Sequence, residues 1–340
     1  MERLRPAWER IYAPERHTLF QSFAWNRLAA QQFAGRESPL VVFAETDSGA
    51  AIVPACVLGR SAATSGACDA SERRKISLLG DMLFDYRAIL HAGDERVCQA
   101  ALLHLADLEL PLELTAVREQ DLAPFEHLAP TVFCNAPSVK RESVTADQFA
   151  AEHSRLGRFF RRLAKQRVEL QQFFGDQEQL IRWVYQKKGE QFVGSAADIF
   201  SDRSRIDFMV RAAALDPGKF EIFAFTVGGK VVAALVTLRD HHVRRFYTVW
   251  FDQEWAQYSP GTVLVFAITQ RSLAEGLDCD YMTGEQPHKI RLATGMTRLF
   301  KVSGPLRAAE AAASQTQLAV EPDNPVMDLR TSEPLPQAAD

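Results

Sequence analysis

Apolar residues are grouped most clearly in the C-terminal half of the chain, where their spacing predicts three strands. Phe220–Thr226 and Val231–Leu238 are apolar runs rich in β-branched and aromatic residues. Gly228-Gly229 lies between these runs and is a strong signal for a two-residue hairpin turn. Val243–Phe251 follows at strand spacing. The pattern therefore predicts a hairpin with a third strand after it.

A helix is predicted next, beginning at Tyr258-Ser259-Pro260-Gly261 and ending at Gly276. Its apolar residues recur at helical spacing; they are Val263, Leu264, Phe266, Ala267 and Leu273. No acidic residue occurs between Pro260 and Glu275, so the peptide N–H groups at the helix start are expected to be free to contact a phosphate. Leu277–Met282 then reads as a short strand that carries Asp280.

The N-terminal half repeats this order of hairpin, strand, helix and strand. The expected elements are the hairpin of Leu40–Glu45 and Ala50–Val57, the strand Ile76–Leu79, the helix Asp94–Leu105 and the strand Leu112–Val117. A further helix, Gln21–Phe33, precedes them. The repetition predicts a duplicated α/β unit.

The starts of the two repeated helices differ in charge. The first begins Gly93-Asp94-Glu95, which places two carboxylates at the positive end of the helix dipole, where they would repel a phosphate. The second begins Pro260-Gly261-Thr262-Val263 without an acid. The C-terminal unit is therefore the one expected to hold a phosphorylated cofactor, and the N-terminal unit a structural or substrate-binding one.

Composition describes an ordinary globular protein. The 340 residues suffice for two domains, 47% are hydrophobic and 24% charged, and the net charge of −4 argues against a preference of the whole protein for nucleic acid. The five cysteines are scattered without metal or redox spacing, so reduced thiols and no metal are expected. Neither a signal peptide nor a run of about 20 apolar residues is found, which predicts a cytoplasmic protein without a transmembrane segment.

Two further segments stand out by composition. Positive charges without an acid run from Arg155 to Arg167 and would share one flank of a helix; they are Arg155, Arg158, Arg161, Arg162, Lys165 and Arg167. A solvated helix face, or a surface for an anionic polymer, a tRNA or acidic lipid, would explain them. Residues 307–340 are poor in large apolar side chains, so a disordered tail is expected.

These residues resemble a known family. The run Tyr258-Ser259-Pro260-Gly261, followed by Gly276, Asp280, Gly284 and Lys289, is similar to the GNAT-like acyltransferases, and more narrowly to their cellulose-biosynthesis-protein-like or FemAB-like branch. Phe20-Gln21-Ser22 with Trp25, and the pair Asp85-Tyr86, match the way that branch begins. The resemblance spans roughly residues 15–305. Members usually have a tyrosine before the lysine, whereas this chain has His288-Lys289.

The resemblance implies an α/β fold of two tandem GNAT-like domains, each a mixed twisted sheet flanked by helices. The expected N-terminal domain, residues 1–138, is degenerate and faces the acceptor; the C-terminal domain, residues 139–306, binds the acyl donor, acetyl-CoA or another acyl-CoA. The third strand of such a unit splays from the next, and the donor lies in the gap. The residues implied in donor binding are Tyr258, Pro260, Gly261, Thr262 and Val263.

Acyl transfer to an amine needs a polarised carbonyl and a route for the proton. Asp280, Glu285 and His288 are the catalytic candidates, although an acid at a strand end often caps a loop and a lone histidine is often solvated. The substrate-binding candidates are Asp85, Tyr86, Trp250 and Lys289, for which turn, core and solvated roles are the alternatives. Cys279, in a strand, is expected to be buried and inert, which favours direct transfer.

The resulting hypothesis is a cytoplasmic N-acyltransferase that moves an acyl group from acyl-CoA to an amine acceptor. By family analogy the acceptor is an amino sugar or a precursor of exopolysaccharide or the cell envelope. One alternative is an aminoacyl-tRNA-dependent FemAB-type transferase that binds tRNA at Arg155–Arg167, and the other is a non-catalytic binding protein of a polysaccharide synthesis system. The sequence leaves the acyl group and the oligomeric state open.

Overall fold

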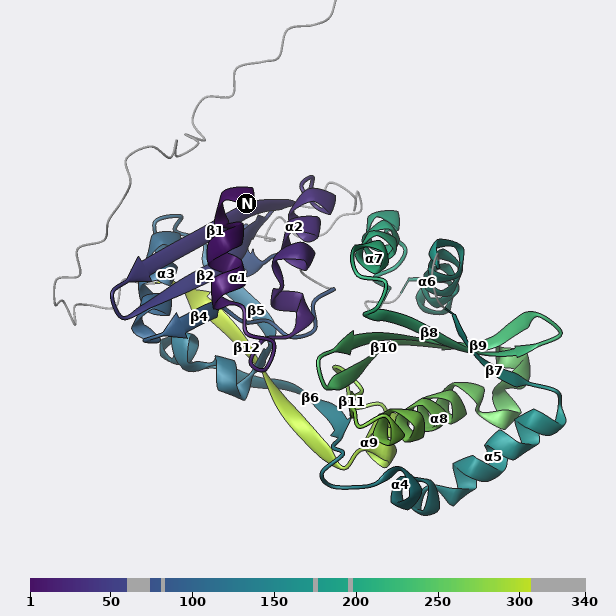
Figure 1. Ribbon diagram of the computed structural model, residues 1–340. Helices are drawn as coiled ribbons and strands as arrows, with labels where there is room; N and C mark the ends of the chain where they lie inside the picture. Colours follow the sequence, from purple (N-terminus) through teal and green to yellow (C-terminus); the bar gives the residue numbers. More distant parts are fainter. Residues whose placement is uncertain (60–73, 81–82, 174–176, 195–197, 307–340) are drawn as a thin grey trace, which may run out of the picture.

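The computed structural model describes residues 1–59, 74–80, 83–173, 177–194 and 198–306 (Figure 1). The tail that is expected to be disordered, residues 307–340, lies outside the described residues. Within the described ranges, no helix combines the length and the apolar character that crossing a bilayer requires.

The strands in the described ranges form one mixed sheet of twelve. They are β1 Glu37–Thr46, β2 Gly49–Leu58, β3 Lys75–Leu78, β4 Leu90–Gly93, β5 Pro111–Arg118, β6 Thr131–Val139, β7 Glu169–Phe173, β8 Phe220–Val227, β9 Lys230–Asp240, β10 Val243–Phe251, β11 Asp278–Asp280 and β12 Gly295–Pro305. Their order is β1-β2-β3-β5-β12-β6-β11-β10-β9-β8-β7, and β4 pairs with β2 outside this path.

Helices cover both faces of this sheet (Figure 1). The α-helices are α1 Arg5–Ile11, α2 Phe23–Gln32, α3 Arg96–Ala106, α4 Ala146–Glu152, α5 Ser154–Lys165, α6 Glu178–Phe192, α7 Arg203–Leu215, α8 Pro260–Ala274 and α9 Pro287–Leu292. The 3-10 helices are η1 Glu2–Leu4, η2 Leu19–Gln21, η3 Glu119–Asp121, η4 Ala123–Leu128 and η5 Gln253–Tyr258.

The repeated order of elements is present in both halves, and the α/β fold class is confirmed. In the first half the antiparallel hairpin β1–β2 is followed by β3, α3 and β5, and β3 runs parallel to β5. In the second half the hairpin β8–β9 is followed by β10, α8 and β11, and β10 runs parallel to β11. Gly228 and Gly229 have φ of 54° and 78°, the left-handed values that a tight hairpin turn of this type demands.

Two strands cross between the halves. β6 follows the first repeat in sequence but pairs with β11 of the second, and β12 follows the second repeat but pairs with β5 of the first. β6 and β12 also pair with each other, so the sheet is continuous through the expected boundary after residue 138, which falls inside β6. Neither β6 nor β12 was among the expected strands, and the exchange is a feature that the pattern of the chain does not reveal.

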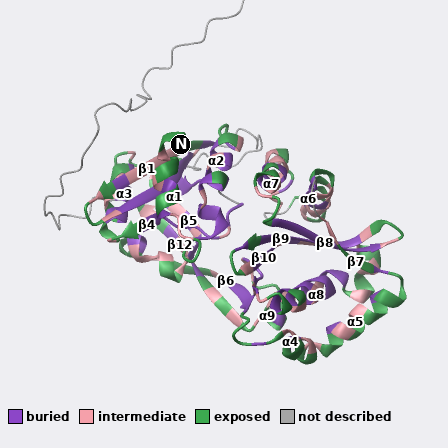
Figure 2. Ribbon diagram, viewed as in Figure 1, coloured by how far each residue is buried: buried purple, intermediate pink, exposed green. Residues whose placement is uncertain are grey.

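The core of the C-terminal half has two layers (Figure 2). Buried side chains of α8 pack with α4 and α5 on one face of its strands, and Phe149 stacks on Phe266 with ring centroids 5.7 Å apart. On the other face, α6 and α7 pack in a cluster that also contains α2 of the N-terminal half. Trp25 of α2 and Phe33, just after α2, contact Phe208 of α7, so this second layer joins the two halves.

Candidate active site

A cleft opens where β10 separates from β11. The two strands are paired only from Val243 to Arg245 and from Asp278 to Asp280. Beyond Arg245, β10 continues alone on that side while the chain after β11 turns away. The resulting cleft has a volume of about 1250 Å³ and is lined by α6, by β10, by side chains of the segment that follows β11 and by Asp85 of the other half. This is the splayed arrangement that the resemblance implies.

The cleft edge of β10 is shaped by a β-bulge and by α6. The register between β10 and β9 shifts between Phe246 and Thr248, and such bulges bend a strand. Further along, Lys188 Nζ donates to the carbonyl of Val249 at 2.9 Å, and Gln191 donates to that of Phe251 at 3.4 Å. Since a residue in an antiparallel strand points its N–H and C=O to the same side, the N–H groups of Val249 and Phe251 face the cleft as well.

The start of α8 is uncapped and carries no acid, while Pro260 and Gly261 are buried and none of residues 258–263 lines the cleft. Ser259 has a left-handed backbone with φ of 48°, no side chain caps the helix, and its first turn holds no acid. The Val263 N–H is used inside the helix because it donates to the Ser259 carbonyl at 3.0 Å, which leaves the amides of Gly261 and Thr262 as those that precede the helical ladder. The first-half counterpart differs: Asp94 Oδ1 accepts the Arg96 N–H at 2.9 Å at the start of α3.

Gly261 lets α8 approach β10 closely. A Cβ atom at this position would lie 3.0 Å from Cδ1 of the Phe251 ring and 3.5 Å from Cγ2 of Val249. The glycine therefore fixes the distance between the helix start and the end of the strand that lines the cleft. Tyr258, half-buried just before the helix, packs against Trp255 with ring centroids 5.7 Å apart.

Asp85 and Lys289 meet at one end of the cleft, at the junction of the two halves. Thr283 Oγ1 donates to Asp85 Oδ1 at 2.9 Å, and Lys289 Nζ donates to the Thr283 carbonyl at 2.7 Å. Burial raises the pKa of Asp85 to about 6, against smaller opposing effects of Thr283 and Lys289. Burial also lowers the pKa of Lys289. Two predicted substrate-binding residues are thus brought together, from opposite halves of the chain.

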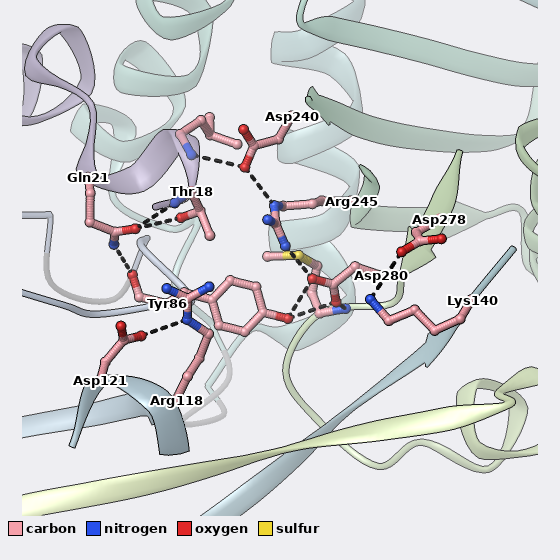
Figure 3. A network of polar contacts seen from close by, with 12 residues as sticks. Thr18, Gln21, Tyr86, Arg118, Asp121, Lys140, Asp240, Arg245, Asp278 and Asp280 are labelled. Carbon is pink, nitrogen blue, oxygen red and sulfur yellow. Dashed lines mark hydrogen bonds and ion pairs between the residues drawn. The ribbon is translucent and has the colours of Figure 1, made fainter. Parts of the chain in front are cut away.

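Asp280 and Tyr86 belong to a buried ionic chain beside the cleft (Figure 3). The Tyr86 hydroxyl donates to the Asp280 carboxylate at 2.7 Å, and Arg245 binds the same carboxylate. Arg245 Nε also donates to Asp240 Oδ2 at 3.0 Å, and Asp240 accepts the N–H of Leu19 at 3.0 Å. The Asp280 carboxylate thereby connects the two halves, and neither it nor Tyr86 is among the residues that line the cleft.

The remaining predicted residues are divided between the cleft and its surroundings. His288 lines the cleft, half-buried, and its pKa is lowered by burial and by Lys289, Lys188 and Arg291. Trp250 also lines it and packs edge-to-face on Trp183 at 4.8 Å. Glu285 is exposed and accepts from Asn135 Nδ2 at 2.7 Å.

Cys279 is buried in β11, and burial raises the pKa of its thiol to about 12. A thiol in this state carries almost no thiolate at neutral pH, and the thiolate is the nucleophilic form.

Lys188 is a cleft residue that the sequence reading overlooked. It is half-buried on α6, and its pKa falls to about 8, chiefly by burial and also by repulsion from Lys289. A signal was available, because Ile181, Val184 and Tyr185 form a buried stripe and Lys188 continues that stripe at helical spacing. A lysine on an apolar stripe points to a constrained ammonium group.

The basic segment forms α5 and the residues just after it. Its six cations are exposed, and none has an ion pair with a described residue. Arg155 and Arg162 lie over the Phe159 ring, 5.9 and 5.4 Å from its centroid. α5 packs against η5 and α8. This positive surface therefore lies beside η5, the 3-10 helix that connects β10 to α8.

Part of the chain that contains the cleft matches a known protein family. Residues 151–290, which include α6, the cleft strand and α8, match the family described as acetyltransferase (GNAT) domain. This segment is similar to GNAT domains. A search of curated proteins gives no match.

Solved structures share the fold over most of the chain, beyond the GNAT domain. One is the C-terminal domain of a putative lysylphosphatidylglycerol synthetase from Agrobacterium fabrum, with 10% identity, 88% of this chain and 92% of that chain covered, and a TM-score of 0.54. A protein of unknown function from Bacteroides thetaiotaomicron has 13% identity, coverages of 82% and 90%, and a TM-score of 0.53. FemX has 8% identity, coverages of 85% and 96%, and a TM-score of 0.51. At these identities the likeness shows a shared fold and nothing more.

Proposed function

We propose that this protein is a cytoplasmic N-acyltransferase that moves an acyl group from acetyl-CoA or another acyl-CoA to an amine acceptor, an amino sugar or a precursor of exopolysaccharide or the cell envelope. The observation that carries the proposal is the cleft in the GNAT domain between β10 and the segment after β11, with the uncapped start of α8 at the end of β10.

The donor is assigned to the edge of β10. The amides of Gly261 and Thr262 bind its diphosphate, because a helix start without acids attracts an anion. Tyr258 and Pro260 shape the turn into the helix, and Val263 supports it from within. The N–H groups of Val249 and Phe251 face the cleft, and one of them polarises the thioester carbonyl as negative charge develops on its oxygen.

The chemical step is a direct transfer. The amine nitrogen attacks the thioester carbon, a C–N bond forms, the C–S bond breaks, and the thiolate leaves. His288 accepts the proton that the amine loses, because its lowered pKa keeps the imidazole neutral at pH 7. The buried, protonated Cys279 supports a mechanism without an acyl-enzyme intermediate.

The acceptor is assigned to the junction of the two halves. Asp85 binds the amine, Lys289 an acidic or polar group of the acceptor, and Trp250 walls the site. Asp280 and Tyr86 hold this end of the cleft in position through their buried contact, and Glu285 lies exposed beyond β11.

A calorimetric titration with acetyl-CoA and longer acyl-CoAs tests the donor site. Gly261→Asp is expected to abolish binding because it places a carboxylate at the helix start. Gly261→Ala is the matched control: it adds the same Cβ next to Phe251 without a charge, and it is expected to bind within a few-fold of the unaltered protein. Thr262→Glu adds a charge without that Cβ contact and is expected to abolish binding too. Unchanged affinity in both acidic variants would exclude the proposed phosphate site.

A second candidate is an aminoacyl-tRNA-dependent transferase, which the exposed, unpaired cations of α5 favour. It predicts a tRNA complex whose affinity falls roughly tenfold or more between 50 and 200 mM salt, as expected for a few phosphate contacts. Replacing Arg158, Arg161 and Arg162 by glutamine should flatten that salt dependence. Indifference to tRNA at low salt would dismiss this candidate, and a folded protein that binds neither tRNA nor any acyl-CoA would instead support a non-catalytic binding role.

A further inference from the structure

Two ammonium groups line the cleft without a counter-ion. Lys188 comes from α6 and Lys289 from α9, and both are half-buried. Each donates to a single backbone carbonyl, Lys188 to Val249 at 2.9 Å and Lys289 to Thr283 at 2.7 Å. Among the described residues, no carboxylate lies within ion-pair distance of either. An ammonium group has three N–H donors, so most of their donor capacity is unused.

The other two lysines that line the cleft form ion pairs with carboxylates. Lys187 is paired with Glu190 at 2.6 Å, and Lys230 with Asp252 at 3.1 Å, at the rim of the cleft. The chain thus provides carboxylate partners for its rim lysines and none for the two inner ones. Withdrawing an ammonium group from water without a carboxylate costs free energy, and the Phe192 ring, whose centroid lies 4.8 Å from Lys188 Nζ, offsets only part of that cost. An arrangement that keeps two such groups is therefore expected to be matched by a ligand.

The inner lysines are close enough to affect each other. The pKa of Lys188 is lowered chiefly by burial and also by Lys289. The pKa of His288 is lowered chiefly by burial and also by both lysines. The carboxyl group that faces Lys289 from the other half is Asp85, which is bonded to Thr283. Asp85 therefore offsets part of the positive charge at Lys289, and an anion placed between the two ammonium groups would relieve the repulsion that lowers the pKa of Lys188.

We infer that Lys188 and Lys289 together bind an acidic group of the acceptor, a carboxylate or a phosphate, so that the substrate class is amines that also carry an acid. This rests on the proposed function for the acceptor being an amine. The acid is assigned to the acceptor because of Lys289: the donor diphosphate is assigned to the start of α8, which lies against Val249 and Phe251 at the end of β10. Lys289 instead lies beside Thr283 and Asp85, where the amine is assigned.

Paired acceptors test the inference by calorimetry, with and without saturating CoA. Glucosamine 6-phosphate is compared with glucosamine, and alanine with alaninamide, which separates phosphate from carboxylate. We expect at least one acid-bearing member to bind tenfold or more tightly than its neutral partner. Lys188→Met and Lys289→Met should each weaken binding of that probe at least tenfold and leave the neutral one unchanged. Lys230→Met, the rim control, should change neither.

Acetyl-CoA provides the discriminating arm. Both inner-lysine variants should bind it within twofold of the unaltered protein. Weaker acetyl-CoA binding with unaltered acceptor binding would assign the acidic group to the donor and overturn the inference. Equal affinities within both pairs, or no binding of any acid-bearing probe, would overturn it as well. The acceptors are also titrated without CoA. Their affinities can therefore be interpreted even if the Gly261 variants disprove the proposed donor site.

Discussion

Asp85 is the residue through which the N-terminal half contributes an ionisable group to the cleft. It comes from the N-terminal half and lines the cleft of the C-terminal half, where Thr283 donates to it. A carboxyl group in this position can bind an ammonium group only when it is ionised. Its folded-state pKa of about 6, against 3.8 for an exposed aspartate, means that ionisation takes place within the range of ordinary assays.

Asp85→Asn should remove the rise in acceptor affinity that accompanies ionisation of the Asp85 carboxyl group. In the unaltered protein, affinity for the amine should rise as pH increases through about 6, because the carboxylate forms there. The amide cannot ionise, so the variant should bind weakly and without that rise. Calorimetric titration of the acceptor between pH 5 and 7.5 measures both curves. A rise that persists in the variant would assign the titration to another group.

The same substitution should stabilise the fold at neutral pH, although it weakens acceptor binding. A raised pKa means that the folded state holds the proton more tightly than the unfolded one, so the ionised carboxyl opposes folding above its unfolded pKa. Stability of the unaltered protein should therefore decline as pH rises from about 4 to 6, and Asp85→Asn should not share this decline. At pH 7 the variant is expected to be more stable by on the order of 1–3 kcal/mol, measured by urea unfolding.

At the scale of elements, the predictable parts are those whose contacts are local. The hairpin of β8 and β9, the strand β10 and the helix α8 follow the expected ranges within a few residues, because turn glycines and apolar period fix them. β6 and β12 pair across the halves, and β6 carries Pro137, which argues against a strand. The open start of α8 was readable from charge alone, whereas the role of Lys188 depends on β10 passing beside α6.

Gly229→Ala tests how far the hairpin turn fixes the β8–β9 pair. Gly229 has φ of 78°, and an added Cβ would meet no atom within 4 Å, so the cost of the change is that of the backbone alone. We expect a loss of about 1 kcal/mol in urea unfolding. Gly35→Ala is the matched control, since it too has open space but no left-handed φ, and it should be neutral. A similar loss in both variants would contradict the backbone explanation.

At the scale of the whole molecule, the halves are bound together by exchanged strands and by buried charge. β6 and β12 each complete the sheet of the other half, so the pairs β5–β12 and β6–β11 are lost if the halves separate. The chain of Tyr86, Asp280, Arg245 and Asp240 adds a polar connection at the cleft (Figure 3). The position of Asp85, next to Tyr86 in sequence, depends on both.

Arg245→Met should break this connection and affect binding as well as stability. Asp240 and Asp280 are 4% and 8% exposed, so removal of the arginine leaves two buried carboxylates without their cation. We expect a loss of about 3–5 kcal/mol in urea unfolding. Because Tyr86 would lose the fixed position of its partner Asp280, acceptor affinity should fall too, while affinity for acyl-CoA at the start of α8 is retained.

Arg244→Met is the control that separates these effects. Arg244 is as deeply buried as Arg245, but its partners Glu221, Ser272 and Glu275 all lie in the C-terminal half. Its loss should destabilise the fold by a comparable amount and leave acceptor affinity unaltered in the protein that remains folded. If both variants weaken acceptor binding equally, general loosening of the GNAT domain explains the effect. If only Arg245→Met does so, the buried charge between the halves positions the acceptor end of the cleft.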